Sequence, residues 1–479
     1  MEEVVKEIVQ QNDSIGTRHR STNDKDLTIF DKIVQANKGV PLVLKEGDIR
    51  VLTSRSALKC NTCQWPKSNQ GVVTIPYVIP SKFSSANRDL IRSAMVEFST
   101  MTCVVFKVRS KEYSYINFQD EEGCWSYIGK GNGEQTINLN QPGCMNYGVI
   151  QHELMHSLGF FHEHTRFDRD NYVDVNWQYI SPENQKEFVK DKGNTDNFPY
   201  DYTSVMHYGS KSFVNTSEQY SLIPKPDPNV NIGQRTGLSS MDVKKINTLY
   251  DCSLCRTKLL GSSGSFSSND ATPVNNDDSC LWLLHVPSSL ILLRFSKFVC
   301  APAKCNATIN VYNGVSKNST LLATIKGGEP LPMLISSGQF MLVEYITNKT
   351  TLSSFSASYS TVFYGGTFTA NNGSVLSPNY PFPYPNNAKG TYIIIAPLGY
   401  QILLNFTVFD LEETPKCTND YLIINDGGDI NSPRLGIYCG MKTNLVVTSS
   451  GSMALLQFSS SSTTRGKGFI ISYSFVSKK

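Results

Sequence analysis

A run of eleven residues in the middle of the chain places three imidazoles and a carboxylate at fixed intervals. On a helix, His152 and His156 lie four positions apart and therefore share one face, with Glu153 beside the first of them. Gly159 can adopt the left-handed backbone conformation that ends a helix and turns the chain, so that His162 returns toward the same point. Three protein ligands with one open position for water are typical of a catalytic zinc site.

The alternative is that these histidines are unrelated residues of an amphipathic helix, because a bare His-Glu-x-x-His sequence also occurs by chance. Here three of the chain's seven histidines fall within eleven residues, with a glycine at the bend. This extended pattern favours a zinc site. We therefore predict a helix over residues 148–159, besides strands over residues 72–79 and 115–118 and a helix over residues 87–100.

A second motif lies downstream, Ser204-Val205-Met206-His207-Tyr208, and is similar to the methionine turn beneath the metal of metzincin proteases. Together with the run from His152 to Val173, it resembles the astacin family of zinc endopeptidases over roughly residues 60–252. The resemblance implies peptide-bond hydrolysis in protein substrates with one catalytic Zn²⁺. No acyl-enzyme is formed in such a reaction, and the chain has no competing Gly-x-Ser-x-Gly signature.

The same resemblance assigns roles to the site residues. His152, His156 and His162 hold the zinc, and Glu153 acts as general base toward water. Tyr208 is implied to be a further, displaceable zinc ligand that can donate a hydrogen bond to the oxyanion.

Three further residues receive roles in the same way. Met206 forms the hydrophobic base of the site. Glu163 pairs with the new amino terminus after propeptide removal, with a local salt bridge to Arg166 or Arg169 as the alternative. In the segment Leu44-Lys45-Glu46-Gly47-Asp48-Ile49, which resembles the astacin aspartate switch, Asp48 is implied to bind zinc in the zymogen. An ordinary Gly-Asp turn is the alternative for this segment.

A chain of 479 residues is too long for one ordinary core, so we expect several domains. After Cys255 short β-branched and aromatic runs alternate with Gly, Asn and Ser turns, which is typical of β-sandwiches. Two copies of this texture repeat, as in Phe295-Ser-Lys-Phe298 and Phe406-Thr-Val-Phe409. Both copies resemble CUB domains.

The predicted fold is therefore multidomain, an α+β metzincin-type protease domain followed by two all-β CUB sandwiches. We expect a pro-segment at residues 1–55, the protease domain at 56–253, and CUB domains at 255–361 and 364–476. Activation would cut near Arg55-Ser56, in a basic and polar stretch of the kind that proteases nick.

Twelve cysteines, an even number, indicate disulfides and an oxidising compartment. The family resemblance implies six pairs: Cys60–Cys63, Cys103–Cys252, Cys124–Cys144, Cys255–Cys280, Cys300–Cys305 and Cys417–Cys439. The alternative is a structural zinc site built from Cys60, Cys63, Cys252 and Cys255. In the second CUB copy, Tyr364 and Gly390 stand where the first bridge would lie.

Glu412 and Asp420 match two calcium-ligand positions of calcium-binding CUB domains, but the third falls at Ser461. Because fewer carboxylates bind a hard cation weakly, calcium binding there is expected to be weak. The alternative is that Glu412 and Asp420 are ordinary surface acids.

Seven Asn-x-Ser/Thr sequons also indicate secretion: Asn12, Asn215, Asn306, Asn318, Asn348, Asn372 and Asn405. The start at Met1 lacks an apolar signal core, so we expect that the true start lies further upstream, with unconventional secretion as the alternative. The net charge of +3 gives no support to nucleic-acid binding, and no apolar run approaches the length of a membrane span.

Three functions remain open at this point. The first is a secreted zymogen endopeptidase whose CUB domains engage substrate or matrix, with the architecture of amphibian hatching enzymes and hence egg-envelope proteins as substrates. The second is a CUB-mediated binding protein with a vestigial protease domain. The third is a tolloid-like protease that processes matrix precursors.

Overall fold

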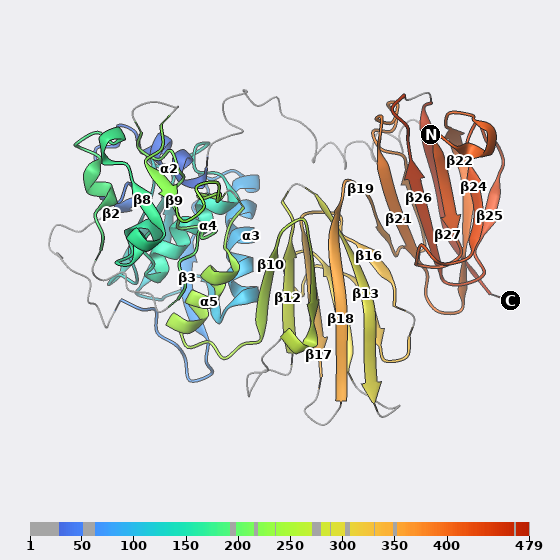
Figure 1. The fold of residues 1–479 in the computed structure, drawn as a ribbon. Helices are drawn as coiled ribbons and strands as arrows, with labels where there is room; N and C mark the ends of the chain where they lie inside the picture. Colours follow the sequence, from blue (N-terminus) through green and yellow to red (C-terminus); the bar gives the residue numbers. More distant parts are fainter. Residues whose placement is uncertain are drawn as a thin grey trace. The chain divides into compact units, whose positions relative to one another are not determined.

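The computed structural model describes residues 28–50, 63–191, 198–214, 219–234, 236–270, 279–287, 289–301, 307–329, 331–347, 352–463 and 466–478. The chain forms two compact units (Figure 1). The first comprises Met1–Pro66, Thr74–Ala94 and Phe106–Asp242, and the second comprises Lys67–Val73, Met95–Val105 and Val243–Lys479.

A seven-stranded sheet of order β1-β2-β6-β7-β5-β3-β4 forms the scaffold of the catalytic region. Its strands are β1 (Leu44–Lys45), β2 (Ile49–Arg50), β3 (Val73–Val78), β4 (Val104–Val108), β5 (Tyr115–Gln119), β6 (Cys124–Tyr127) and β7 (Glu134–Leu139). The helices are α2 (Ile29–Asn37), α3 (Ser85–Met101), α4 (Tyr147–Leu158) and α5 (Ser240–Leu249), and β8 (Val173–Val175) pairs with β9 (Leu222–Pro224). The predicted strands and helices correspond to β3, β5, α3 and α4.

Short 3₁₀ helices connect the later part of the catalytic region. They are η2 (Glu163–Thr165), η3 (Arg169–Asn171), η4 (Trp177–Tyr179) and η5 (Gln185–Phe188).

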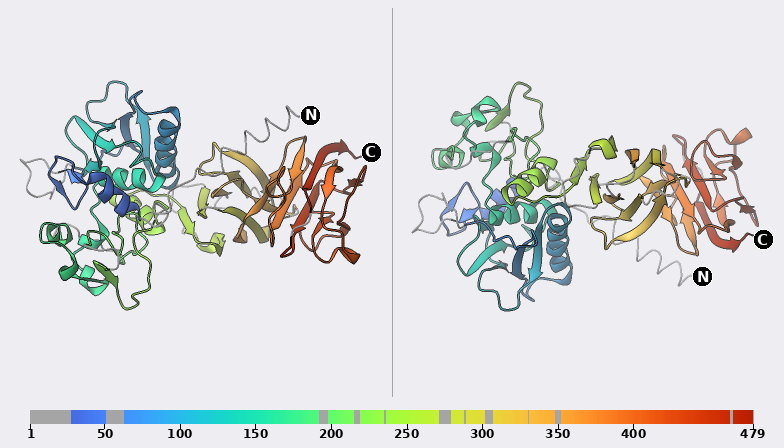
Figure 2. Two further views of the ribbon diagram at one scale, coloured as in Figure 1. Left: turned by 90° about the horizontal axis from the view of Figure 1, so that it is seen from above. Right: turned by 90° about the horizontal axis from the view of Figure 1, so that it is seen from below.

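The predicted pro-segment is built into this unit. Strand β2 pairs in parallel with β6 and so extends the sheet. Helix α2 begins with a capping box, in which the Thr28 hydroxyl accepts from the Asp31 amide and the Asp31 carboxylate accepts from the Thr28 amide. In Figure 2, α2 lies between the segments coloured cyan and those coloured green, in both views. The described part of the predicted pro-segment, residues 28–50, therefore lies in the middle of the unit.

The second unit contains both β-sandwiches. The first has sheets of order β10-β12-β17-β14-β15 and β11-β18-β13-β16. Its strands are β10 (Arg256–Leu260), β11 (Ser263–Ser267), β12 (Ser279–His285), β13 (Leu290–Ala301), β14 (Thr308–Asn313), β15 (Thr320–Lys326), β16 (Met333–Ile335), β17 (Phe340–Ile346) and β18 (Leu352–Val362), with η6 at Ser268–Asp270.

The second sandwich repeats this topology strand for strand, as β19-β21-β26-β23-β24 and β20-β27-β22-β25. Its strands are β19 (Tyr364–Phe368), β20 (Asn372–Leu376), β21 (Lys389–Ile395), β22 (Tyr400–Asp410), β23 (Tyr421–Asn425), β24 (Arg434–Tyr438), β25 (Val446–Thr448), β26 (Met453–Ser459) and β27 (Gly468–Ser477), with η7 at Pro415–Cys417.

The repeat extends to local irregularities. A β-bulge interrupts the pairing of β13 with β18 between Phe295 and Lys297, and another interrupts β22 with β27 between Phe406 and Val408. These bulges fall in the two sequence segments that predicted the repeat. The predicted β-sandwich class is confirmed by this architecture.

Each sandwich has its own apolar core, one centred on residues such as Trp282 and Leu293 and the other on residues such as Leu404 and Leu456. A third, smaller apolar cluster contains residues of both sandwiches: Leu292, Met333, Ile335, Ile393 and Leu455. In the same unit, Lys258 of β10 forms a fully buried ion pair with Glu97 of α3.

Candidate active site

Helix α4 positions the first part of the site. The Asn146 side chain caps its first turn by accepting from the Gly148 and Val149 amides. Gly159 follows the helix in the left-handed conformation, with φ 107°, as its predicted role at the bend requires. All residues from Gly148 to Leu158 are buried, so the ligand-bearing face of α4 is shielded from solvent.

The three histidines and Asp48 bring one ligand atom each to within 4.8 Å of one another. Nε2 of His152 lies 2.9 Å from Oδ2 of Asp48 and 3.1 Å from Nε2 of His162. Nε2 of His156 lies 3.2 Å from Oδ1 of Asp48, and Nε2 of His162 lies 3.4 Å from Oδ2. The turn at Gly159 therefore returns His162 to the other two imidazoles, and the chain before residue 55 supplies a carboxylate to the same point.

Hydrogen bonds at the opposite ring nitrogens fix the direction of each imidazole. Nδ1 of His152 donates to the Val205 carbonyl and Nδ1 of His156 donates to the Phe160 carbonyl, both at 2.8 Å. Nδ1 of His162 lies 2.9 Å from Oε2 of Glu46. With Nδ1 as the donor, Nε2 of each ring presents a lone pair to the common centre.

This donor set fits zinc. A tetrahedron with bonds of about 2.0–2.1 Å has edges of about 3.3 Å, and the four individual distances, from 2.9 to 3.4 Å, lie around that value. Nε2 of His156 is buried and has no hydrogen-bond partner. Nitrogen lone pairs that face one another across about 3 Å repel unless a proton or a metal ion lies between them, so His152, His156, His162 and Asp48 would hold the metal.

The electrostatics favour a cation at this point. Burial alone would lower the pKa of His162, but the Asp48 and Glu46 carboxylates raise it to about 9. Burial would raise the pKa of Asp48, yet the His162 and His156 imidazoles lower it well below its usual range. Burial also lowers the pKa of His152 to about 4, although Asp48 opposes this. The Asp48 and Glu46 carboxylates therefore stabilise positive charge at His162, whereas burial keeps His152 neutral.

Glu153 lies beside the ligands on α4 and is completely buried. Neither of its carboxylate oxygens has a hydrogen-bond partner. Burial, and then the nearby Asp48 carboxylate, raise the pKa of Glu153 well above its usual range. A buried carboxylate without a partner is expensive, so its retention beside a metal site indicates a chemical role.

The methionine turn supports the site from below. Met206 is buried, and its carbonyl accepts from the Glu163 amide. The turn is anchored by Asp242, which accepts from the Ser204 hydroxyl at 2.6 Å and from the Val205 amide at 2.9 Å. Since the Val205 carbonyl orients His152, Asp242 supports the first ligand indirectly. The sequence patterns did not single out this residue.

Tyr208 is buried with its hydroxyl directed to the pro-segment, where it donates to the Glu46 carbonyl at 2.7 Å. Phe30 of α2 stacks on the Tyr208 ring, with centroids 3.5 Å apart. In this form of the chain the pro-segment thus engages the hydroxyl and one face of the ring. Sequence reasoning missed Phe30 and Glu46; the only local signal was that Glu46 lies within the Gly-Asp segment.

Comparison with known proteins agrees with this geometry. Residues 59–251 match the Astacin peptidase family, and residues 255–359 and 364–473 each match the CUB domain. The chain is 37% identical over 458 residues to embryonic protein UVS.2 of Xenopus laevis, an alignment that covers 94% of this chain and 88% of that protein. The chain belongs to the astacin family.

Two further relatives extend the astacin likeness. An astacin-like metalloendopeptidase of Gallus gallus is 43% identical over 344 residues, covering 71% of this chain and 84% of that protein. High choriolytic enzyme 1 of Oryzias latipes is 44% identical over 231 residues, covering 48% of this chain and 86% of that protein. The chain is a zinc metalloendopeptidase of the astacin family, so it acts on protein substrates through one catalytic zinc ion.

Glu163, for which the family resemblance implied a pairing with the new amino terminus, is buried in the structure. Its Oε1 lies 3.2 Å from Arg166 and accepts from the Asp201 amide at 2.9 Å. The local salt bridge to Arg166, which was the alternative role, is thus present in the structure. The expected partner of Glu163, an amino terminus near residue 56, lies outside the described residues.

The structure joins Cys103 to Cys252, Cys124 to Cys144, Cys255 to Cys280 and Cys417 to Cys439, the pairs expected from the astacin and CUB resemblance. Cys63 and Cys300 are also disulfide-bonded, but their expected partners Cys60 and Cys305 lie outside the described residues. The alternative of a four-cysteine zinc site is wrong, because Cys252 and Cys255 are bonded to other cysteines.

In the second CUB domain, Asp420 is fully buried, so its interpretation as an ordinary surface acid is wrong. It accepts from the Tyr384 hydroxyl at 2.6 Å and from the Ser461 amide at 2.7 Å. Glu412 is partly buried and accepts from the Asn419 side chain. Both Asp420 oxygens thus already accept hydrogen bonds from the protein, and this arrangement adds no support for a calcium site.

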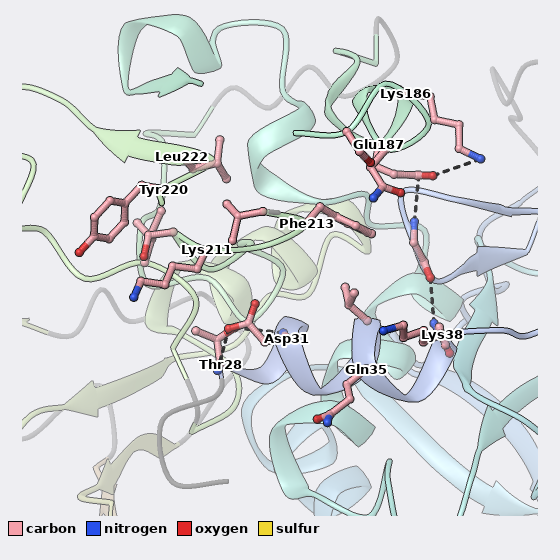
Figure 3. A pocket seen from close by; sticks show the side chains of 18 of the residues that line it. Thr28, Asp31, Gln35, Lys38, Lys186, Glu187, Lys211, Phe213, Tyr220 and Leu222 are labelled. Atoms are coloured by element: carbon pink, nitrogen blue, oxygen red, sulfur yellow. Dashed lines mark hydrogen bonds and ion pairs between the residues drawn. The ribbon is translucent and has the colours of Figure 1, made fainter. Parts of the chain in front are cut away.

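A groove of about 1650 Å³ runs along the pro-segment in the first unit. Figure 3 shows Asp31 and Gln35 of α2, with Lys38 just after the helix, on one side and Glu187 and Phe213 on the other. Oε2 of Glu187 accepts from the Gly47 amide at 3.1 Å. The groove is therefore partly lined by residues of the predicted pro-segment.

Proposed function

We propose that the chain is the precursor of an extracellular zinc endopeptidase, with residues 1–55 as its removable pro-segment and residues 56–253 as its protease domain. One observation carries the proposal. Asp48 contributes a carboxylate within 3.4 Å of Nε2 of all three histidines. A catalytic zinc site keeps such a fourth position for water, so Asp48 excludes water until the pro-segment is removed.

Zinc, when bound by His152, His156 and His162, supplies a Lewis acid that polarises the substrate carbonyl and lowers the pKa of a water molecule. Glu153 takes the proton of the attacking water and delivers it to the departing amine. Its position on α4 and its two unpartnered oxygens support this role.

Tyr208 leaves the Glu46 carbonyl when the pro-segment departs, and its hydroxyl can then reach the metal or stabilise the oxyanion of the substrate. Glu163 exchanges Arg166 for the new amino terminus, because a buried ammonium requires a paired carboxylate. Met206 keeps the base of the site apolar.

Hydrolysis of a quenched peptide library by the full chain tests this function. Trypsin-treated chain is expected to cleave, and the activity should be lost with a chelator and in Glu153→Ala. The uncleaved Asp48→Ala chain should cleave peptides without trypsin, whereas uncleaved wild type should not. Absence of cleavage, with zinc bound and the pro-segment removed, would instead favour a binding protein that uses its CUB domains.

We further propose egg-envelope proteins as substrates. The support is the 44% identity to high choriolytic enzyme 1, whose name describes action on the chorion. The activated chain should release soluble fragments from isolated egg envelopes, and Glu153→Ala should not. Cleavage of matrix precursors with no effect on envelopes would favour the tolloid-like alternative.

Secretion is supported by the disulfides and by the accessible sequons. Among the described residues, Asn318, Asn372 and Asn405 are exposed on the sandwiches. No helix in the described part of the chain has the length and hydropathy needed to cross a membrane. Glycan mapping at these three asparagines of protein from a eukaryotic host tests the proposal, and full occupancy is expected at one of them at least.

A further inference from the structure

The three zinc-ligand histidines are oriented by groups of different origin. His152 and His156 donate from Nδ1 to the carbonyls of Val205 and Phe160, which belong to the protease domain itself. His162 has Oε2 of Glu46 at 2.9 Å from its Nδ1. Glu46 lies before the predicted activation site, so only this one of the three contacts is removed when the pro-segment is cut away.

Glu46 is held firmly at this contact. It is 1% exposed, and its φ of 52° precedes Gly47 at 79°. A side chain at Gly47 would also meet the rings of Phe213 and Phe30, with a Cβ only 3.1 Å from each. The tight turn is therefore needed to bring both Glu46 and Asp48 to the site.

The Glu46 carboxylate makes further contacts on the same side of the site. Oε2 accepts weakly from the Thr165 hydroxyl and from the His162 amide, both at 3.4 Å, and Oε1 lies 3.4 Å from Nζ of Lys45. Burying a carboxylate is costly unless it is paired. Here its shortest contact is the imidazole nitrogen of a zinc ligand.

A carboxylate that accepts from Nδ1 of a zinc ligand fixes the tautomer and direction of the ring and makes Nε2 more basic. We propose that Glu46 is a positioning residue for His162, and that the pro-segment thereby increases the zinc affinity of the uncleaved chain. The inference rests on the proposed zinc ligands. It assigns the pro-segment a second task, because Asp48 blocks the site while Glu46 helps to load it with metal.

The consequence is an order of events. The uncleaved chain acquires zinc with four ligands and three oriented imidazoles. Removal of the pro-segment then takes away one ligand and one orienting carboxylate together. The activated enzyme should therefore hold zinc less tightly than its precursor.

Zinc affinity, measured by competition with a chromophoric chelator, tests this directly. The full chain is used uncleaved, with Glu153→Ala to prevent self-cleavage. Adding Glu46→Ala should raise the dissociation constant for zinc by about 10- to 100-fold. Glu46→Gln, which keeps an acceptor but loses the charge, should lie between Glu46→Ala and the parent. Glu183→Gln, an exposed residue of the groove, is the matched control and should change nothing.

The activated enzyme supplies an internal control for folding. Residue 46 leaves with the pro-segment, so wild type and Glu46→Ala give the same mature sequence after trypsin. Loaded with zinc, both should hydrolyse the peptide at the same rate, which shows that the variant precursor folded. Equal zinc affinities of the Glu46→Ala and parent precursors would overturn the inference. A parent precursor that binds no zinc would instead refute the proposed zinc site, and these two failures are distinct.

Discussion

Buried carboxylates differ between the two regions of the molecule. Beside the three histidines of the first unit, a buried carboxylate lacks hydrogen-bond partners, whereas the buried carboxylates of the sandwiches compared below have them. Both oxygens of Glu153 and Nε2 of His156 have none. In the sandwiches, Asp420 accepts from Tyr384 and Ser461, and Glu344 accepts from Tyr312, Asn310 and Lys317.

The difference separates burial that serves chemistry from burial that serves stability. An unsatisfied buried carboxylate lowers the free energy of unfolding, so it persists where a metal, water or substrate completes it. Carboxylates with hydrogen-bond partners and apolar cores stabilise the fold and need no ligand to complete them. Substitutions in the two regions should therefore change different quantities, and the expected effects below run from the largest to the smallest.

Glu153→Gln should lower kcat/KM for a peptide by about 10³-fold or more in the activated chain, because the proposed general base is lost. Stability should stay the same or increase, because a buried carboxylate without partners is replaced by a neutral amide. Peptide hydrolysis and urea unfolding measure the two quantities, with Glu183→Gln as the exposed control. A large loss of stability in Glu153→Gln would contradict the comparison.

Leu404→Ala in the second sandwich should show the opposite pattern. Leu404 is completely buried in the core, so its truncation should lower the free energy of unfolding by about 4 kcal/mol. Hydrolysis of a short peptide should change by less than about twofold, because Leu404 has no proposed role in the reaction. Leu398, which is 81% exposed, gives the matched control Leu398→Ala. Calorimetry of the full chain reads the stability.

Sequence patterns predicted what is local. The spacing of His152, His156, Gly159 and His162 specifies a helix, a bend and a returning ligand, and all of these are present. The repeated Phe-x-x-Phe segments predicted two copies of one sandwich, because equivalent residues flank equivalent bulges.

Contacts between distant segments were not predictable in the same way. Glu46 contacts His162, 116 positions away in the sequence. Asp242 of helix α5 accepts from the amide of Val205, which lies in the methionine turn. A glutamate beside a glycine and an aspartate on a helix look like ordinary surface residues in a single sequence. Their burial follows from tertiary packing, which local spacing does not encode.

Removal of the Cys255–Cys280 bridge tests how far the two sandwiches are equivalent. The two cysteines are 25 residues apart in the sequence. A disulfide that closes a loop of this size stabilises the folded state by about 3 kcal/mol, because it restricts the unfolded chain. At the equivalent strand position, Tyr364 pairs with Gly390, and the partly buried Tyr364 packs against the second core.

We expect the double substitution Cys255→Ser with Cys280→Ser to lower the free energy of unfolding by about 3 kcal/mol, with peptide hydrolysis unchanged. Tyr364→Ala should cost about 1 kcal/mol, because only part of an apolar side chain is buried there. Urea unfolding followed by circular dichroism measures both. If Tyr364→Ala lowered the free energy of unfolding as much as loss of the bridge does, the packing of Tyr364 would stabilise the second sandwich as much as the disulfide stabilises the first.

The first sandwich should also show a pH dependence of its stability, smaller than the effect of losing its disulfide bridge. Burial, followed by the Lys258 ammonium, lowers the pKa of His285 to about 3, against the opposing influence of Glu97. His285 is 1% exposed, stacks on Phe340 at 4.1 Å and has no partner for Nδ1. The folded chain therefore keeps this imidazole neutral in mild acid.

In the unfolded chain the same imidazole titrates near 6.5. Between that value and about 3 the unfolded state binds the extra proton, so stability falls as the pH falls. From pH 7 to pH 5 the loss should be about 2 kcal/mol. His285→Phe keeps the ring stack and should remove this slope, as calorimetry at several pH values would show. The second sandwich contains no histidine and provides the comparison within the same molecule. A slope that survives in His285→Phe would have to arise from the buried Lys258–Glu97 pair or from the catalytic region.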